Sequence, residues 1–180
     1  GHVQANEPLF ATLLEVLAEA KETPVLASGG IATGHNIRKI LGVGAAGAVM
    51  GSRFMATKES YGHSEYKEAL VDAGEESTVF TTCFNREWFA LHRVLKNKTF
   101  QMWQAAGCPL TGNRPGEDDI VAKGGDDFLV KRYSIMPPLE WLQGNISELA
   151  MYAGKGLVSI KVIPSANDLL LQLATEFKKN

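Results

Sequence analysis

The stretch that decides the fold of this chain is Thr23–Ser60, TPVLASGGIATGHNIRKILGVGAAGAVMGSRFMATKES. It contains two short apolar runs, at residues 23–28 and 46–51, and a helical pattern at residues 34–45 lies between them. Short apolar runs bounded by Pro and Gly are typical of strands that are buried on both faces of a parallel sheet. We therefore predict two neighbouring buried strands that are connected by a helix.

Helical patterns also flank these strands. Residues 8–21, PLFATLLEVLAEAK, place leucines at helical spacing with charged residues on the other side, and Pro8 suits a first helical turn. Residues 58–74, KESYGHSEYKEALVDAG, predict a polar-faced helix that ends at Gly74. Alternating helices and strands with short loops indicate an α/β fold with a parallel sheet and right-handed crossovers.

The pattern changes after residue 75. Residues 77–84 alternate in part and predict a strand or an extended segment, while residues 108–127 are rich in Gly, Pro and Asp and predict a loop. Helical spacing recurs in three later segments, at residues 86–107, 146–157 and 165–179. We therefore predict a first domain at residues 1–75 and a mostly helical C-terminal subdomain at residues 76–180 that packs on it.

Glycines follow both predicted strands at their carboxyl ends, where parallel α/β proteins bind ligands. Gly29-Gly30 ends the first run and Gly51-Ser52 ends the second, and we call these four residues the phosphate cup. Because glycine has no side chain, its backbone N–H group can approach an anion closely, and the start of the following helix adds a partial positive charge. Within the cup Ser52 could add a hydroxyl group, and the adjacent Arg53 could add a positive charge. The alternative is that the glycines only form turns and close packing contacts.

The same stretch resembles the nitronate monooxygenase family, also called 2-nitropropane dioxygenases, which are FMN-dependent TIM-barrel flavoenzymes. The shared pattern is a GGIA-G turn, a helix ending in LGA-G and a GTRF-AT-ES segment, with further similarity in VFTTCF, NRPGEDDIVA, RYSIMPP and LAMYAGKGL. The resemblance implies that residues 1–75 are the C-terminal part, about strands 7–8, of an FMN-binding (β/α)8 barrel. It also implies that FMN is the cofactor and that its phosphate is held by Gly29, Gly30, Val49, Met50, Gly51 and Ser52.

The resemblance also assigns a role to the first two residues, Gly1 and His2. In this family a GGH motif carries the histidine proposed as catalytic base, so His2 falls on the catalytic position and Gly1 on the second glycine, beside the cofactor. Taking a C–H proton from a nitroalkane requires a base that is neutral near pH 7, and imidazole meets that requirement. The alternative is that Gly-His is the remnant of an expression tag.

By resemblance, the chain is an oxidoreductase that oxidises alkyl nitronates with O2 as the electron acceptor. Flavin-dependent enoyl-acyl-carrier-protein reductases and NAD(P)H:quinone reductases share the same glycine motifs and are the first alternative. The second alternative is a catalytically inert piece that only binds phosphate or associates with other subunits. An eight-stranded barrel needs five or six strands that this chain lacks, so we expect association with an N-terminal half or a homo-oligomer.

The chain departs from the family pattern at three residues. Ser52 stands where threonine is usual, and Lys155 and Val158 alter a motif that is close to AGQGVGLI in the family. The resemblance therefore carries no ligand contact over to the loop around Lys155.

Composition limits the partners and the compartment. The chain has 18 Lys+Arg against 20 Asp+Glu without a long block of one sign, so we expect neither a nucleic-acid nor a membrane partner. No apolar run is long enough to span a bilayer. Cys83 and Cys108 have no metal-ligand spacing and predict ordinary thiols in a reducing compartment, which favours the cytoplasm.

Three groups of residues resemble functional sites but favour a structural interpretation. The aromatic residues Trp88, Phe89, Trp103 and Trp141 predict core or domain packing rather than a substrate pocket. Asp118, Asp119, Asp126 and Asp127 predict solvated turns rather than a metal site. His35 predicts a solvated residue at a helix start.

Overall fold

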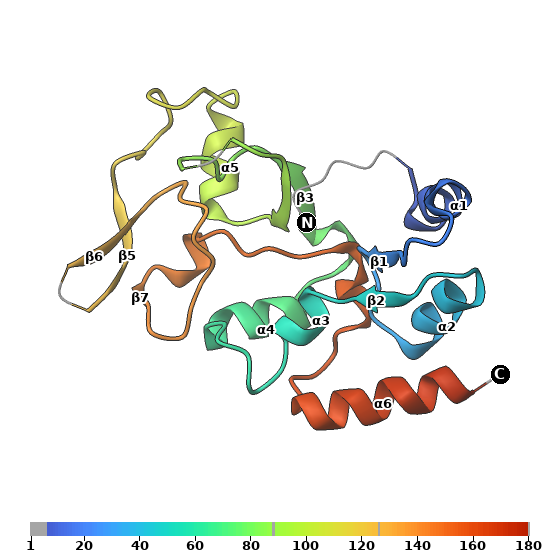
Figure 1. Ribbon diagram of the computed structural model, residues 1–180. Helices are drawn as coiled ribbons and strands as arrows, with labels where there is room; N and C mark the ends of the chain where they lie inside the picture. Colours follow the sequence, from blue (N-terminus) through green and yellow to red (C-terminus); the bar gives the residue numbers. More distant parts are fainter. Residues whose placement is uncertain (1–6, 88, 126, 180) are drawn as a thin grey trace.

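The computed structural model describes residues 7–87, 89–125 and 127–179 (Figure 1). Its N-terminal part contains α1 (Leu9–Ala20), β1 (Leu26–Ser28), α2 (Gly34–Gly42), β2 (Gly47–Val49), α3 (Ser52–Met55) and α4 (Ser64–Asp72). β1 and β2 pair in parallel, with Leu26 opposite Gly47 and Ser28 opposite Val49. The predicted alternation of helices and strands and the parallel pairing are confirmed.

A small apolar core holds this part together. It contains Leu13 from α1, Ala27 from β1 and Ile40 from α2, because the apolar positions of both helices recur at helical spacing. The strands are not covered on both faces, since Leu26 is 62% and Val49 is 47% exposed. Side chains alternate along a strand, and the two helices cover only the face that carries Ala27. The prediction that both faces of these strands are buried is therefore wrong for the described chain.

The region after residue 75 is not mostly helical. Its α-helices among the described residues are α5 (Lys98–Ala105) and α6 (Ala166–Lys178). The strands are β3 (Thr78–Thr81), β4 (His92–Leu95), β5 (Ile120–Gly124), β6 (Phe128–Lys131) and β7 (Gln143–Gly144), and the 3-10 turns are η1 (Glu75–Ser77), η2 (Ile146–Glu148) and η3 (Lys155–Ser159). The predicted extended segment at residues 77–84 is confirmed, whereas the mostly helical subdomain is wrong. No helix in the described ranges is long and apolar enough to cross a membrane.

Non-local pairing explains where the helix predictions fail. β4 lies within the segment 86–107 and pairs antiparallel with β3, with Thr81 opposite His92. The segment 146–157 runs beside β4, where Leu95 N–H donates to the Met151 carbonyl at 2.8 Å. β5 is the central strand of an antiparallel sheet in the order β6-β5-β7. Pairing with a distant strand overrides local spacing, and the one-dimensional pattern does not record it.

Two later parts of the chain return to the N-terminal elements. α6 lies along α2 in Figure 1, and Gly34 N–H donates to Glu176 Oε2 at 2.8 Å. The main apolar core joins Leu70 of α4 to Leu95 and Leu157. This core therefore contains residues from both sides of residue 75. The division into two domains at residue 75 stays a prediction.

Candidate functional site

The glycines predicted to form the phosphate cup lie at neighbouring strand ends. β1 and β2 are paired in parallel and end together at Ser28 and Val49, so the residues that follow emerge at the same edge. Gly29 and Gly30 have φ angles of +115° and +70°, which side-chain-bearing residues rarely adopt. The chain therefore turns sharply after β1 and can present backbone N–H groups at that edge.

The cup glycines face open space. Among the described residues, and apart from each glycine's two neighbours in the chain, a Cβ atom added at Gly29, Gly30 or Gly51 would have no heavy atom within 4 Å. Backbone at all three positions is thus accessible from the side on which a side chain would stand. A small group that approaches the backbone from this side would displace no atom of the described residues.

A third segment closes one side of the cup. Gly154 N–H donates to Ser52 Oγ at 2.9 Å. A Cβ atom on Gly156 would lie 2.8 Å from the Gly30 carbonyl oxygen, so η3 packs directly on the turn after β1. Sequence reasoning missed this segment because residues 146–157 have helical spacing. The signal that could have indicated it is the pair of glycines around Lys155, which allows close backbone approach.

Arg53 is placed differently from the prediction that its charge joins the cup. Its side chain is 3% exposed, and Nη2 donates to Gln172 Oε1 of α6 at 3.3 Å. Nη1 is buried without a hydrogen-bond partner among the described residues. Burial lowers the pKa of the guanidinium, and the negative charge of Glu176 acts in the opposite direction. This cation therefore lies between α3 and α6.

The start of α2 is occupied by the protein's own groups. Thr33 caps the helix with Asn36 in a reciprocal capping box, and Glu176 Oε2 accepts from Gly34 N–H. Burial raises the pKa of the Glu176 carboxyl, but hydrogen bonds from Gln172 and Gly34 and nearby positive charge bring the pKa below its usual value. Because a carboxylate from α6 already accepts a hydrogen bond at the start of α2, this helix start contributes little positive charge to the binding of a ligand in the cup. His35 lies beside that carboxylate and is exposed, as predicted.

The remaining predicted site residues fall in two groups. Val49 ends β2 and is exposed, and Met50 packs against the core of α1 and α2. Both contribute backbone to the edge that carries Gly51. Gly1 and His2, predicted as cofactor-binding and catalytic, lie outside the described residues.

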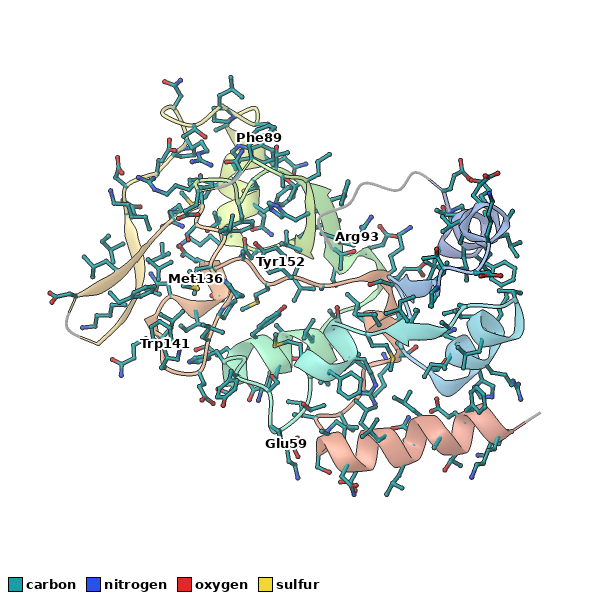
Figure 2. All side chains as sticks on the ribbon, in the orientation of Figure 1. Glu59, Phe89, Arg93, Met136, Trp141 and Tyr152 are labelled. Atoms are coloured by element: carbon teal, nitrogen blue, oxygen red, sulfur yellow. The ribbon has the colours of Figure 1, made fainter. Side chains whose placement is uncertain are left out.

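The aromatic and acidic residues lie elsewhere. Trp141 contacts Phe128 edge-on, with ring centroids 5.1 Å apart, and Figure 2 places Trp141 by the β5–β6–β7 sheet, across the molecule from β1 and β2. Trp103 Nε1 donates to the Pro109 carbonyl. Asp118 pairs with both Arg86 and Lys131, which holds the pKa of its carboxyl below the usual value. Trp88 and Asp126 lie outside the described residues.

Comparison with known proteins identifies relatives over nearly the whole chain. The family model described as nitronate monooxygenase matches residues 1–176. A nitronate monooxygenase of Pseudomonas aeruginosa is 28% identical over 92% of this chain and 43% of its own length. A (3aS,4S,5R,7aS)-5-hydroxy-7a-methyl-1-oxo-octahydro-1H-indene-4-carboxyl-CoA dehydrogenase of Mycobacterium tuberculosis is 30% identical over 93% of this chain and 43% of its own.

A solved structure shares the fold. FabK from Thermotoga maritima superimposes with a TM-score of 0.69 at 25% identity, over 99% of this chain and 51% of FabK. The chain thus spans about half of that structure and less than half the length of these curated relatives. Its mixed α/β fold is that of one part of a larger architecture.

Proposed function

The chain belongs to the nitronate monooxygenase family, and from that premise we propose that it carries the flavin-phosphate site of an FMN-dependent oxidoreductase. The reaction we assign to the complete protein is oxidation of alkyl nitronates with O2 to a carbonyl compound and nitrite. β1 and β2 would be about strands 7 and 8 of its barrel. The uncovered faces around Leu26 and Val49 support association with an N-terminal half that supplies the other strands.

The strongest support for a flavin phosphate is the backbone at the two strand ends. Gly29, Gly30 and Gly51 face open space that a Cβ atom would enter, which fits a cradle for a group that approaches the backbone closely. The Ser52 hydroxyl stands beside them and accepts from Gly154. Backbone N–H groups and one hydroxyl are suitable donors for phosphate oxygens. These residues, with the backbone of Val49 and Met50, are the ones that would hold FMN.

In this proposal His2 is the catalytic base. Neutral imidazole would take the acidic C–H proton of a nitroalkane near pH 7, and the cup would fix the cofactor so that substrate and base meet. The chemistry that FMN supplies in such an enzyme is electron transfer from the substrate to oxygen. Replacement of His2 by Asn should lower turnover of a neutral nitroalkane much more than turnover of its preformed nitronate, since the nitronate has already lost the proton.

The test is the visible absorption spectrum of the purified protein before and after FMN is added and the mixture is desalted. A retained flavin band that is lost in Gly51→Glu would support the site, because the new side chain fills the cup with bulk and negative charge. Gly42→Glu is the matched control, since Gly42 also faces open space but lies at the far end of α2. A protein that never retains flavin, even with its N-terminal half supplied, would contradict the proposal and favour an inert association piece.

A second reaction class follows from the relative in Mycobacterium tuberculosis, which is named as a carboxyl-CoA dehydrogenase and matches this chain as extensively as the nitronate monooxygenase does. The flavin-dependent enoyl-acyl-carrier-protein reductases and NAD(P)H:quinone reductases, which share the glycine motifs, are a further alternative to nitronate oxidation. Consumption of NAD(P)H with an enoyl thioester or a quinone, without nitronate turnover, would favour it. Nitrite release from a nitronate would favour the first proposal.

A further inference from the structure

We infer that Gly154, Lys155 and Gly156 form the third wall of the phosphate cup and that Lys155 supplies the positive charge that binds the phosphate. The inference deepens the proposed function and rests on it, because the ligand is the FMN phosphate. It assigns the ligand a residue that differs from the glutamine in the family motif.

The glycines on either side of Lys155, Gly154 and Gly156, both lie close to the cup. Gly154 N–H donates to Ser52 Oγ at 2.9 Å, and a Cβ atom on Gly154 would be 3.8 Å from Gly30 N. A Cβ atom on Gly156 would be 2.8 Å from Gly30 O and 3.0 Å from Ala32 Cβ. The backbone on both sides of Lys155 thus lies against the turn after β1, and on one side it also bonds to Ser52, the first residue of α3.

The Ser52 hydroxyl can bond to the η3 segment and to a phosphate oxygen at once. A hydroxyl group has one donor hydrogen and two acceptor lone pairs. Ser52 Oγ accepts from Gly154, so its own hydrogen stays available to donate to a phosphate oxygen. The hydrogen bond from Gly154 therefore orients the Ser52 hydroxyl, and Ser52 would bind the η3 segment and the phosphate at the same time.

The phosphate cup itself has no charged side chain. The cup contains glycines and a serine, and the neighbouring Arg53 guanidinium donates to Gln172 on α6. Lys155 is exposed and begins η3, one residue from each contact with the cup. Its flexible stem carries an ammonium that acts as a point charge toward phosphate. No ion pair involves Lys155 within the described ranges, whereas Lys98 and Lys131 pair with carboxylates.

The test compares FMN with riboflavin, which lacks the phosphate. Binding of each to the protein is titrated by quenching of flavin fluorescence for wild type, Lys155→Gln, Lys155→Arg and Lys161→Gln. Lys161 is the matched control, because it is also exposed and follows the buried Ile160 after η3 ends. We expect Lys155→Gln to weaken FMN binding about tenfold and to change riboflavin binding less than about twofold. Lys155→Arg and Lys161→Gln should stay within about threefold of wild type for FMN.

Other results overturn the inference. If Lys155→Gln binds FMN like wild type, or loses FMN and riboflavin equally, Lys155 does not contact the phosphate, while flavin retention by wild type still supports the proposed function. If wild type binds neither flavin, both the proposed function and this inference fail. Far-ultraviolet circular dichroism and thermal melting of each variant show that the affinities compare equally folded proteins.

Discussion

Two sets of glycines in this chain look alike in sequence and lie in opposite surroundings. In the part of the chain that the structure describes, a Cβ atom on Gly30 or Gly51, at the strand ends, would meet no heavy atom within 4 Å other than those of its chain neighbours. A Cβ atom on Gly34 would meet backbone atoms of α6, and one on Gly156 would meet the carbonyl of Gly30. The first set leaves room for a ligand, and the second lets two backbones pack together. Substitution at the first set should therefore affect ligand binding most, and substitution at the second should affect stability most.

The largest effect on stability is expected at Gly34. Gly34→Ala should lower the free energy of unfolding by about 3 kcal/mol, because the new methyl group overlaps the backbone of α6, which cannot move without losing its packing on α2. Chemical denaturation measures this change. Gly42→Ala, at the open end of the same helix, should stay within about 1 kcal/mol of wild type. Equal effects of the two variants would contradict the close contact between α2 and α6.

Gly156→Ala should lower the free energy of unfolding by about 2 kcal/mol, because its Cβ atom would lie 2.8 Å from the Gly30 carbonyl oxygen. Gly154→Ala is the paired control, since its Cβ atom would be 3.7 Å from Ser52 Oγ, an ordinary contact distance. That variant should lose less than about 0.5 kcal/mol. Thermal melts of both variants, read together with FMN titrations, would reveal whether η3 really rests on the cup. If Gly156→Ala has the same free energy of unfolding as wild type, Gly156 does not pack closely on Gly30, and the inference that η3 forms a third wall of the cup is contradicted.

At the strand ends we expect small losses of stability and large losses of affinity. Gly30→Ala should cost about 1 to 2 kcal/mol, because alanine is strained at the φ of +70°. Gly51→Ala, at a φ of −89°, should cost less than about 0.5 kcal/mol. Both should weaken FMN binding at least about tenfold, because a methyl group enters the space that the phosphate needs. Unchanged FMN affinity in Gly51→Ala would show that the open space is not the binding site.

A small, pH-dependent effect on stability is expected at Glu176, whose carboxylate occupies the start of α2. Its pKa in the folded protein is below the ordinary value, so its contribution to stability is present above about pH 4.3 and is lost as the pH falls through the folded pKa. Glu176→Gln should therefore be less stable than wild type by about 0.3 to 1 kcal/mol at pH 7. The difference in melting temperature should shrink toward pH 3. A difference that grows as the pH falls would contradict the assigned charge.

The sequence predicted the order of elements up to α4, apart from the short helix α3, because that order depends on local patterns. Apolar spacing in α1 and α2, and glycines after short apolar runs, are properties of neighbouring residues. The same patterns located Gly29, Gly30, Gly51 and Ser52 at one edge, since parallel strands joined by one helix end on the same side.

The parts that sequence reasoning missed depend on contacts between distant residues. Glu176 lies 142 residues from the amide of Gly34 that it accepts from, and Gly154 lies 102 residues from Ser52. β4 was predicted as helix because its pairing with β3 leaves no trace in local spacing. The positive charge of the cup was assigned to Arg53 because Arg53 is next to Ser52 in the sequence. The Arg53 side chain instead donates to Gln172 of α6, so that assignment is wrong. Side-chain direction is decided by packing, which a single sequence does not specify.

The most direct measurement is a two-dimensional amide spectrum of 15N-glycine-labelled protein during titration with FMN, with peaks assigned through the alanine variants above. We expect the amide signals of Gly30, Gly51 and Gly154 to shift with FMN. Riboflavin should move them far less, and Gly34 and Gly42 should stay unchanged with either ligand. Shifts at Gly34 with none at Gly30 and Gly51, or equal shifts with FMN and riboflavin, would contradict the phosphate cup.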